Sequence, residues 1–162
     1  MQRNSIRLGS THRAWLFGAF ATAFVTGTAW WVLHRWFQVN GEFGPAPHTA
    51  EPWLIRLHGA AAILTLILLG SLLTQHVRRA WLARRNRRSG TLLLAFNALL
   101  ALTGYALYYA GGESLRALAS NAHLALGLAL PVMLVLHIAF GRRSRSGADD
   151  DLRPDQEDES TG

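Results

Sequence analysis

The feature that most constrains the fold is an apolar run between Arg56 and Arg79, with the sequence RLHGAAAILTLILLGSLLTQHVRR. This run is long enough to cross a bilayer, because about 20 predominantly apolar residues in an α-helix span the hydrocarbon core. Three more apolar blocks of similar length lie at about 15–37, 91–110 and 114–140. A soluble domain of 162 residues would instead alternate short apolar and polar segments. We therefore expect an all-α integral membrane protein, folded as a four-helix bundle.

The arginines predict the orientation of this bundle. The leader, the middle loop and the tail together carry 13 of the 16 arginines, and the chain has no lysine. By the positive-inside rule, both termini are expected to be cytoplasmic, while the loops at 38–52 and 111–112 face outward. We expect a cytoplasmic leader at 1–13, a four-helix membrane domain at 14–141 and a disordered cytoplasmic tail at 142–162. The loop at 38–52 is rich in glycine and proline and is expected to be irregular.

The composition excludes several kinds of chemistry. The chain contains no cysteine, so disulfides, thiolate catalysis, cysteine-ligated zinc, iron–sulfur clusters and covalently attached c-type haem are excluded. The formal charge of +6 comes from arginines that flank the spans, which indicates topology signals rather than a nucleic-acid partner. No catalytic acid, base or nucleophile is evident in the sequence.

Four histidines form the most informative pattern, because ionisable side chains inside membrane spans are costly and mark functional sites. His58 and His76 are 18 residues apart in the second span, on one helical face, and His123 and His137 are 14 apart in the fourth. Both spans are expected to run from outside to inside. The pattern therefore predicts an outer pair, His58 with His123, and an inner pair, His76 with His137. Two imidazoles on either side of an iron are the axial ligands of a b-type haem.

Neighbouring residues support a haem site. A macrocycle that lies flat on a helix requires a small residue one turn after its ligand. The residues four positions after the four histidines are all small: Ala62, Ala80, Gly127 and Gly141. Arg56 and Arg116 lie near the outer pair and could neutralise haem propionates. The two spacings correspond to ~27 and ~21 Å along an ideal helix, a mismatch that tilt or an angled porphyrin must absorb. A kink at Pro131, between His123 and His137, would change the second spacing.

The three remaining histidines have plainer interpretations. His34, at the outer end of the first span, is expected to be an interfacial residue, with proton handling or quinone contact as the alternative. His12 is expected at the level of the lipid headgroups and His48 in a loop.

Three short motifs carry a family resemblance: LHG at 57–59, LTGY at 102–105, and HLALG followed by LHIAFGRR within 123–143. With them the chain resembles the bacterial di-haem b-type membrane cytochromes, a superfamily that includes small cytochrome b reductases and the cytochrome b subunits of hydrogenases and formate dehydrogenases. The resemblance implies two non-covalent b haems in the bacterial cytoplasmic (inner) membrane. It also implies electron transfer between the quinone pool and a periplasmic or membrane redox protein.

One departure from that family concerns the inner pair. In the hydrogenase and formate dehydrogenase subunits, one inner ligand comes from the first helix in an Arg-x-x-His-Trp context. The nearest match here is His12 in THRAW, where Trp15 follows three residues later. On that pattern His12 would replace His76 as the partner of His137.

The expected function is a membrane electron-transfer cytochrome, in which any oxidoreductase activity belongs to the haems. The alternative is a haem-free small membrane transporter or metal-binding protein that uses the same histidines. Cation pathways usually supply carboxylates, and their absence from the interior of the spans argues against this alternative. A third possibility is a haem-free scaffold whose tails recruit partners.

Overall fold

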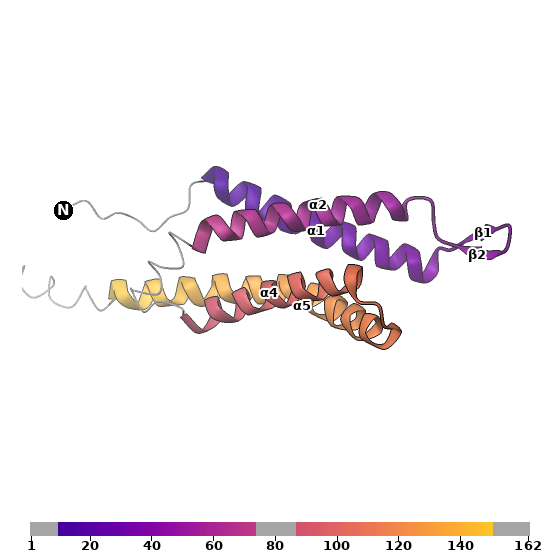
Figure 1. Ribbon diagram of the computed structural model, residues 1–162. Helices are drawn as coiled ribbons and strands as arrows, with labels where there is room; N and C mark the ends of the chain where they lie inside the picture. Colours follow the sequence, from indigo (N-terminus) through magenta and orange to yellow (C-terminus); the bar gives the residue numbers. More distant parts are fainter. Residues whose placement is uncertain (1–9, 74–86, 151–162) are drawn as a thin grey trace, which may run out of the picture. The chain divides into compact units, whose positions relative to one another are not determined.

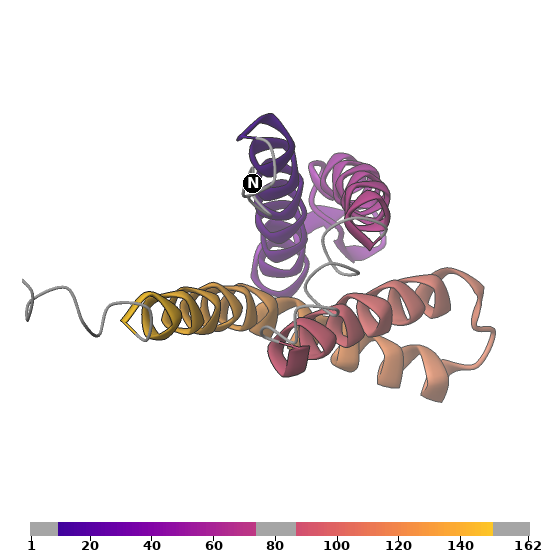
Figure 2. The same ribbon diagram turned by 90° about the vertical axis from the view of Figure 1, so that its left-hand side faces the viewer.

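A computed structural model describes residues 10–73 and 87–150, with side chains as far as residue 141 (Figure 1). The chain divides into two compact units, Met1–Arg79 and Ala80–Gly162. In order, the elements are α1 (Ser10–Trp36), β1 (Val39–Gly41), β2 (Gly44–Ala46), α2 (Glu51–Leu72), α4 (Arg87–Tyr109) and α5 (Glu113–Asp150). Figures 1 and 2 show α1 beside α2 in the first unit and α4 beside α5 in the second. Each unit is therefore built on a pair of helices.

All four described helices are long and apolar enough to cross a membrane, which confirms the expected all-helical architecture with four apolar helices of that length. Among the described residues, the buried hydrophobic side chains are small: Ala19, Ala61 and Ala119. Large apolar side chains remain exposed on every helix, for example Ile67 at 64% and Val135 at 65%. Helices that keep their large apolar side chains outward are suited to an apolar solvent such as lipid.

Small and hydroxyl-bearing residues form the contact between α1 and α2. Ala19 and Thr26 are buried on α1, and Ala61 and Thr65 are buried on α2. Each threonine hydroxyl donates to a carbonyl one turn earlier on its own helix, at 2.6 Å for Thr26 and 2.8 Å for Thr65. These hydroxyls are therefore satisfied within the helix. The small side chains let the two backbones approach closely, as in membrane helix pairs generally.

The loop between α1 and α2 differs from expectation, because it contains a short antiparallel hairpin instead of an irregular chain. Val39 pairs with Ala46, Asn40 with Pro45 and Gly41 with Gly44. Gly44 has φ +120°, a conformation that residues with a Cβ rarely adopt. Proline is tolerated in such an edge strand, where its missing N–H leaves no ladder bond unmade. The glycines and proline that suggested irregularity instead suit a tight turn.

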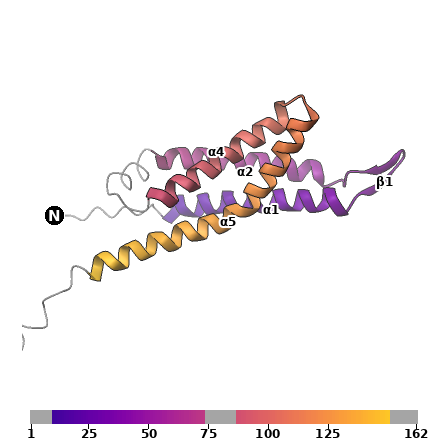
Figure 3. The same ribbon diagram turned by 90° about the horizontal axis from the view of Figure 1, so that it is seen from below.

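The second unit consists of α4, a short connection at residues 110–112 and α5. Figure 3 shows that α5 changes direction between its orange and its yellow part. Pro131 lies inside this helix, where a proline removes a backbone hydrogen bond and kinks the chain. The expected end of the fourth span is near Phe140, but α5 continues to Asp150, and its apolar part is Glu113–Gly141.

Candidate functional site

Three of the four predicted ligands lie on described helices. His58 is on α2 in the first unit, and His123 and His137 are on α5 in the second. His76 lies outside the described residues, as does Ala80. Each of these three histidines is partly buried, and each has a hydrogen-bonding group of the neighbouring helix of its own unit beside its Nδ1 atom.

His58 is held against the backbone of α1. Its Nδ1 lies 2.8 Å from the carbonyl oxygen of Ala23. A carbonyl oxygen only accepts, so Nδ1 carries the proton and the neutral ring has its lone pair on Nε2. The ring also lies directly over Gly27, where an added Cβ would be 2.8 Å from Cε1 of His58. Glycine at position 27 therefore makes room for the imidazole.

His123 is held in the same way, but by a side chain. Its Nδ1 lies 2.9 Å from the hydroxyl oxygen of Thr103 on α4. That hydroxyl lies 2.8 Å from the carbonyl oxygen of Leu99, to which it can donate its one proton. It then accepts from Nδ1–H of His123, which again puts the imidazole lone pair on Nε2. Gly104 stands beside the ring, where an added Cβ would be 3.4 Å from Cε1 of His123.

His137 repeats this arrangement further along α5. Its Nδ1 lies 3.1 Å from the hydroxyl oxygen of Ser89, and a Cβ added to Gly90 would be 3.7 Å from its Cε1. The two hydroxyl–glycine pairs are 14 residues apart on α4, and the two histidines are 14 apart on α5. Because the helices run in opposite directions, one register brings both pairs of contacts together.

The remaining predicted site residues fit the expected roles to different degrees. Gly127 is half-buried and uncrowded, since the nearest atom to an added Cβ would be Cδ2 of Leu100 at 4.0 Å. Gly141 and Ala62 are also half-buried. The small size and partial exposure of these three residues are compatible with a flat ligand one turn after His58, His123 and His137.

The two predicted propionate partners are both exposed. Arg116 lies seven residues before His123, so the two share a face of α5 about 10 Å apart along the axis. The guanidinium of Arg56 instead lies 5.2 Å from the ring centroid of Trp53. Arg56 is two residues from His58 and so points to a nearly opposite side of α2. Of the two, Arg116 is the better placed for a group bound at the neighbouring histidine.

His12 contacts its neighbouring helix through the other ring nitrogen. Its Nε2 lies 3.4 Å from the hydroxyl oxygen of Ser71, which donates to the carbonyl of Leu68 at 2.7 Å. The contact is long and is made through Nε2, whereas the hydrogen bonds described above for His58, His123 and His137 are made through Nδ1. His12 therefore does not share the arrangement of His58, His123 and His137.

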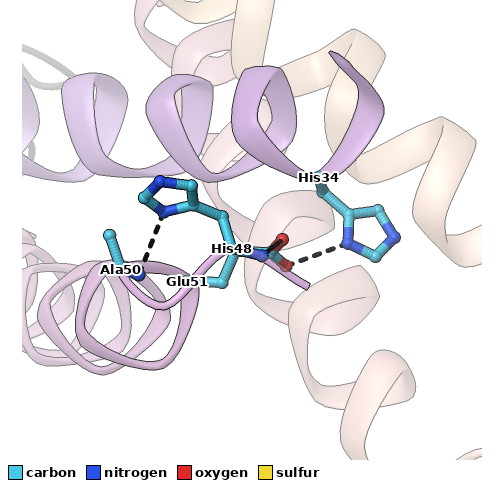
Figure 4. A network of polar contacts seen from close by, with 4 residues as sticks. All are labelled: His34, His48, Ala50 and Glu51. Atoms are coloured by element: carbon cyan, nitrogen blue, oxygen red, sulfur yellow. Dashed lines mark hydrogen bonds and ion pairs between the residues drawn. The ribbon is translucent and has the colours of Figure 1, made fainter. Parts of the chain in front are cut away.

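His34 and His48 belong to a polar network at the start of α2 (Figure 4). Nδ1 of His34 donates to one carboxylate oxygen of Glu51 at 2.9 Å, and the backbone N–H of His48 donates to the other, also at 2.9 Å. The backbone N–H of Ala50 donates to Nδ1 of His48 at 3.1 Å. Glu51 is 5% exposed, and Trp30 stacks on the His34 ring. This network ties the end of α1 to the start of α2.

Sequence reasoning missed the residues that hold the histidines: Ala23, Gly27, Ser89, Gly90, Thr103 and Gly104. A signal for most of them is present, because within the four apolar spans a hydroxyl residue directly before a glycine occurs at 26–27, 89–90 and 103–104. Each of these glycines has a histidine ring beside it. A glycine inside a helix lowers helix stability by about 1 kcal/mol relative to alanine, so its presence there indicates a packing requirement.

In chemical terms, the site offers imidazoles that are oriented through Nδ1 and can ligate through Nε2. Across residues 10–73 and 87–141, no three or more His, Cys, Asp or Glu side chains form a group that could hold a metal ion. A bis-histidine haem requires only two such ligands, because the porphyrin supplies the others. The chemistry of each imidazole is therefore compatible with axial ligation of a haem iron.

No protein-family model, curated protein or solved structure matches this chain.

Proposed function

We propose that this protein is a membrane electron-transfer cytochrome that carries two non-covalent b haems, each between two histidines. The chain passes electrons between the quinone pool and a periplasmic or membrane redox protein. Haem supplies the one-electron redox chemistry, and the residues of the chain ligate it, orient it and surround it with apolar side chains. The proposal includes insertion of the four helices into the bacterial cytoplasmic membrane as a bundle, with both termini inside.

The observation that carries the proposal is the local environment that His58, His123 and His137 have in common. Each has a hydrogen-bonding group of the neighbouring helix beside Nδ1 and a glycine beside the ring. Metal-ligating histidines usually donate their second ring nitrogen to a carbonyl or another acceptor, which fixes the tautomer and the direction of the ligating nitrogen. A histidine that merely lies at a membrane interface has no need of this fixed orientation.

The outer haem has His58 and His123 as its ligands, with Arg116 beside it as a propionate partner. The inner haem has His137 and a partner from the first unit. We propose His76 as that partner, because its helical alignment with His58 places both on one face of the second span. In the sequence, Gly9 precedes Gly27 by the same 18 residues that separate His58 from His76. His12 is the alternative inner ligand.

A haem-free transporter or metal-binding protein would also use these histidines. In the four apolar spans the acidic residues are Glu51 and Glu113, each at the first residue of its helix. Their place at the helix ends leaves the middle of the spans without the carboxylates that cation pathways usually supply. This distribution favours the cytochrome.

The test is a reduced-minus-oxidised visible spectrum of the full chain purified in detergent, with haem quantified against protein. We expect sharp b-type bands and about two haems per chain. His58→Ala and His137→Ala should each remove one haem, whereas His48→Ala, a loop histidine, should remove none. A folded protein without haem bands would refute the proposal. Bound metal detected by mass spectrometry in that protein would then favour the metal-binding alternative.

A further inference from the structure

We propose that Thr103 and Ser89 are positioning residues, each of which orients one histidine and thereby sets the reduction potential of one haem. Thr103 acts on His123 in the outer site, and Ser89 acts on His137 in the inner site. This inference rests on the proposed function, because it concerns the ligands of the two haems. It adds that the two potentials are adjusted separately, by two side chains of one helix.

The hydrogen-bond arrangement around Thr103 supports this role. Its hydroxyl has one proton and two carbonyls within reach, Leu99 at 2.8 Å and Leu100 at 3.1 Å. With that proton donated to either carbonyl, the hydroxyl can only accept from His123, 2.9 Å away. Thr103 thus fixes both the tautomer and the direction of the His123 ring.

A hydroxyl group beside Nδ1 recurs at Ser89, so the arrangement occurs twice along the pair of helices. Ser89 lies 3.1 Å from Nδ1 of His137, and each hydroxyl residue is followed by the glycine that faces the ring. The 14-residue repeat on α4 matches the 14-residue repeat on α5. The two copies are about 21 Å apart along a straight helix, so changes at one should leave the other unaffected.

His58 provides a useful contrast. Its Nδ1–H donates to the main-chain carbonyl of Ala23, a group that no side-chain substitution removes. The outer haem would therefore have one ligand held by backbone and one held by the side chain of Thr103. Of these two hydrogen-bond partners, only the Thr103 hydroxyl can be removed by a side-chain substitution.

A hydrogen bond from Nδ1–H makes the imidazole a stronger electron donor, which favours the oxidised iron and lowers its potential. Removing the acceptor should therefore raise the potential of the haem concerned. A residue with only a packing role would not change the potential of one haem selectively.

The test is a potentiometric titration of the full chain in detergent, with electron paramagnetic resonance spectra of the oxidised haems. Thr103→Val, which keeps the shape but lacks the hydroxyl, should raise the potential of one haem. Ser89→Ala should raise the potential of the other, and the double variant should raise both. Thr103→Ser, which restores the hydroxyl, should return the potential to that of the unaltered protein.

Each of the other outcomes either supports or overturns the positioning role of Thr103 and Ser89. If Thr103→Val loses a haem and Thr103→Ser keeps it, the hydroxyl is required and the inference holds. If both variants lose it, or if Thr103→Val binds two haems at unchanged potentials, the inference fails while the proposed function stands. Shifts of the same haem by Thr103→Val and Ser89→Ala would also overturn it. An unaltered protein without haem would overturn the inference and the proposed function together.

Discussion

Replacing Gly27 by alanine should disrupt the outer site through a single methyl group. The added Cβ would lie 2.8 Å from Cε1 and 2.9 Å from Nδ1 of His58. Non-bonded carbon atoms prefer about 3.5–4.0 Å, so the imidazole must retreat by about 0.7 Å or more. The bond from Nδ1 of His58 to Ala23 is 2.8 Å long, and a retreat of that size along it exceeds the usual limit of about 3.2 Å.

The expected loss is about 10–100-fold in haem affinity at the outer site, the usual effect of removing a group that orients a metal ligand. That range corresponds to about 1.4–2.7 kcal/mol. It is comparable with the cost of about 1–3 kcal/mol for a buried donor left without its acceptor. Alanine favours helix over glycine by about 1 kcal/mol, so the helix itself should not be weakened.

The assay is haem content per chain and haem affinity, from titration of the haem-depleted protein and reduced-minus-oxidised spectra. Gly18→Ala is the matched control, because it makes the same change on the same helix at a site with no heavy atom within 4 Å. We expect Gly27→Ala to lose outer-haem affinity and Gly18→Ala to retain two haems. Unchanged affinity in Gly27→Ala would refute the placement of His58 over Gly27 or its role as a ligand. An equal loss in Gly18→Ala would point to general packing of α1 instead.

Three further predictions concern the other glycines beside histidines, the buried Glu51 and the orientation of the helices in the membrane. The loss of haem affinity caused by alanine should be largest at Gly27, smaller at Gly104 and smallest at Gly90. An added Cβ would be 3.4 Å from the histidine ring at Gly104 and 3.7 Å from it at Gly90, and the haem affinities of the three variants check this order. Glu51→Ala should lower the free energy of unfolding by roughly 1–3 kcal/mol without removing haem, because Glu51 is 5% exposed and its carboxylate accepts two hydrogen bonds. Thermal unfolding in detergent measures this loss of stability. Because the chain has no cysteine, Phe43→Cys in the hairpin turn should react with an impermeant maleimide on intact cells, and Ser10→Cys only after the membrane is opened; the reverse pattern would contradict the orientation.

The sequence alone predicts the four helices, because length and apolar content are properties of each segment by itself. The apolar blocks at 15–37 and 91–110 coincide with α1 and α4 except at their ends: each helix begins a few residues before its block and ends one residue before the block does. The spacing of His123 and His137 is also a local property, since both lie on one helix. The hairpin between α1 and α2 was not predicted, because glycine and proline mark turns without specifying whether the flanking residues pair.

The tertiary structure decided how the histidines are held. Which glycine lies beside which imidazole depends on the register of α1 against α2 and of α4 against α5, and no segment specifies that register by itself. The acceptor at Nδ1 of His58 is a main-chain carbonyl, a group that every residue carries and that no sequence pattern distinguishes. The sequence thus determined that imidazoles occur in the apolar spans, whereas close approach of paired helices determined the direction in which each ring can offer its lone pair.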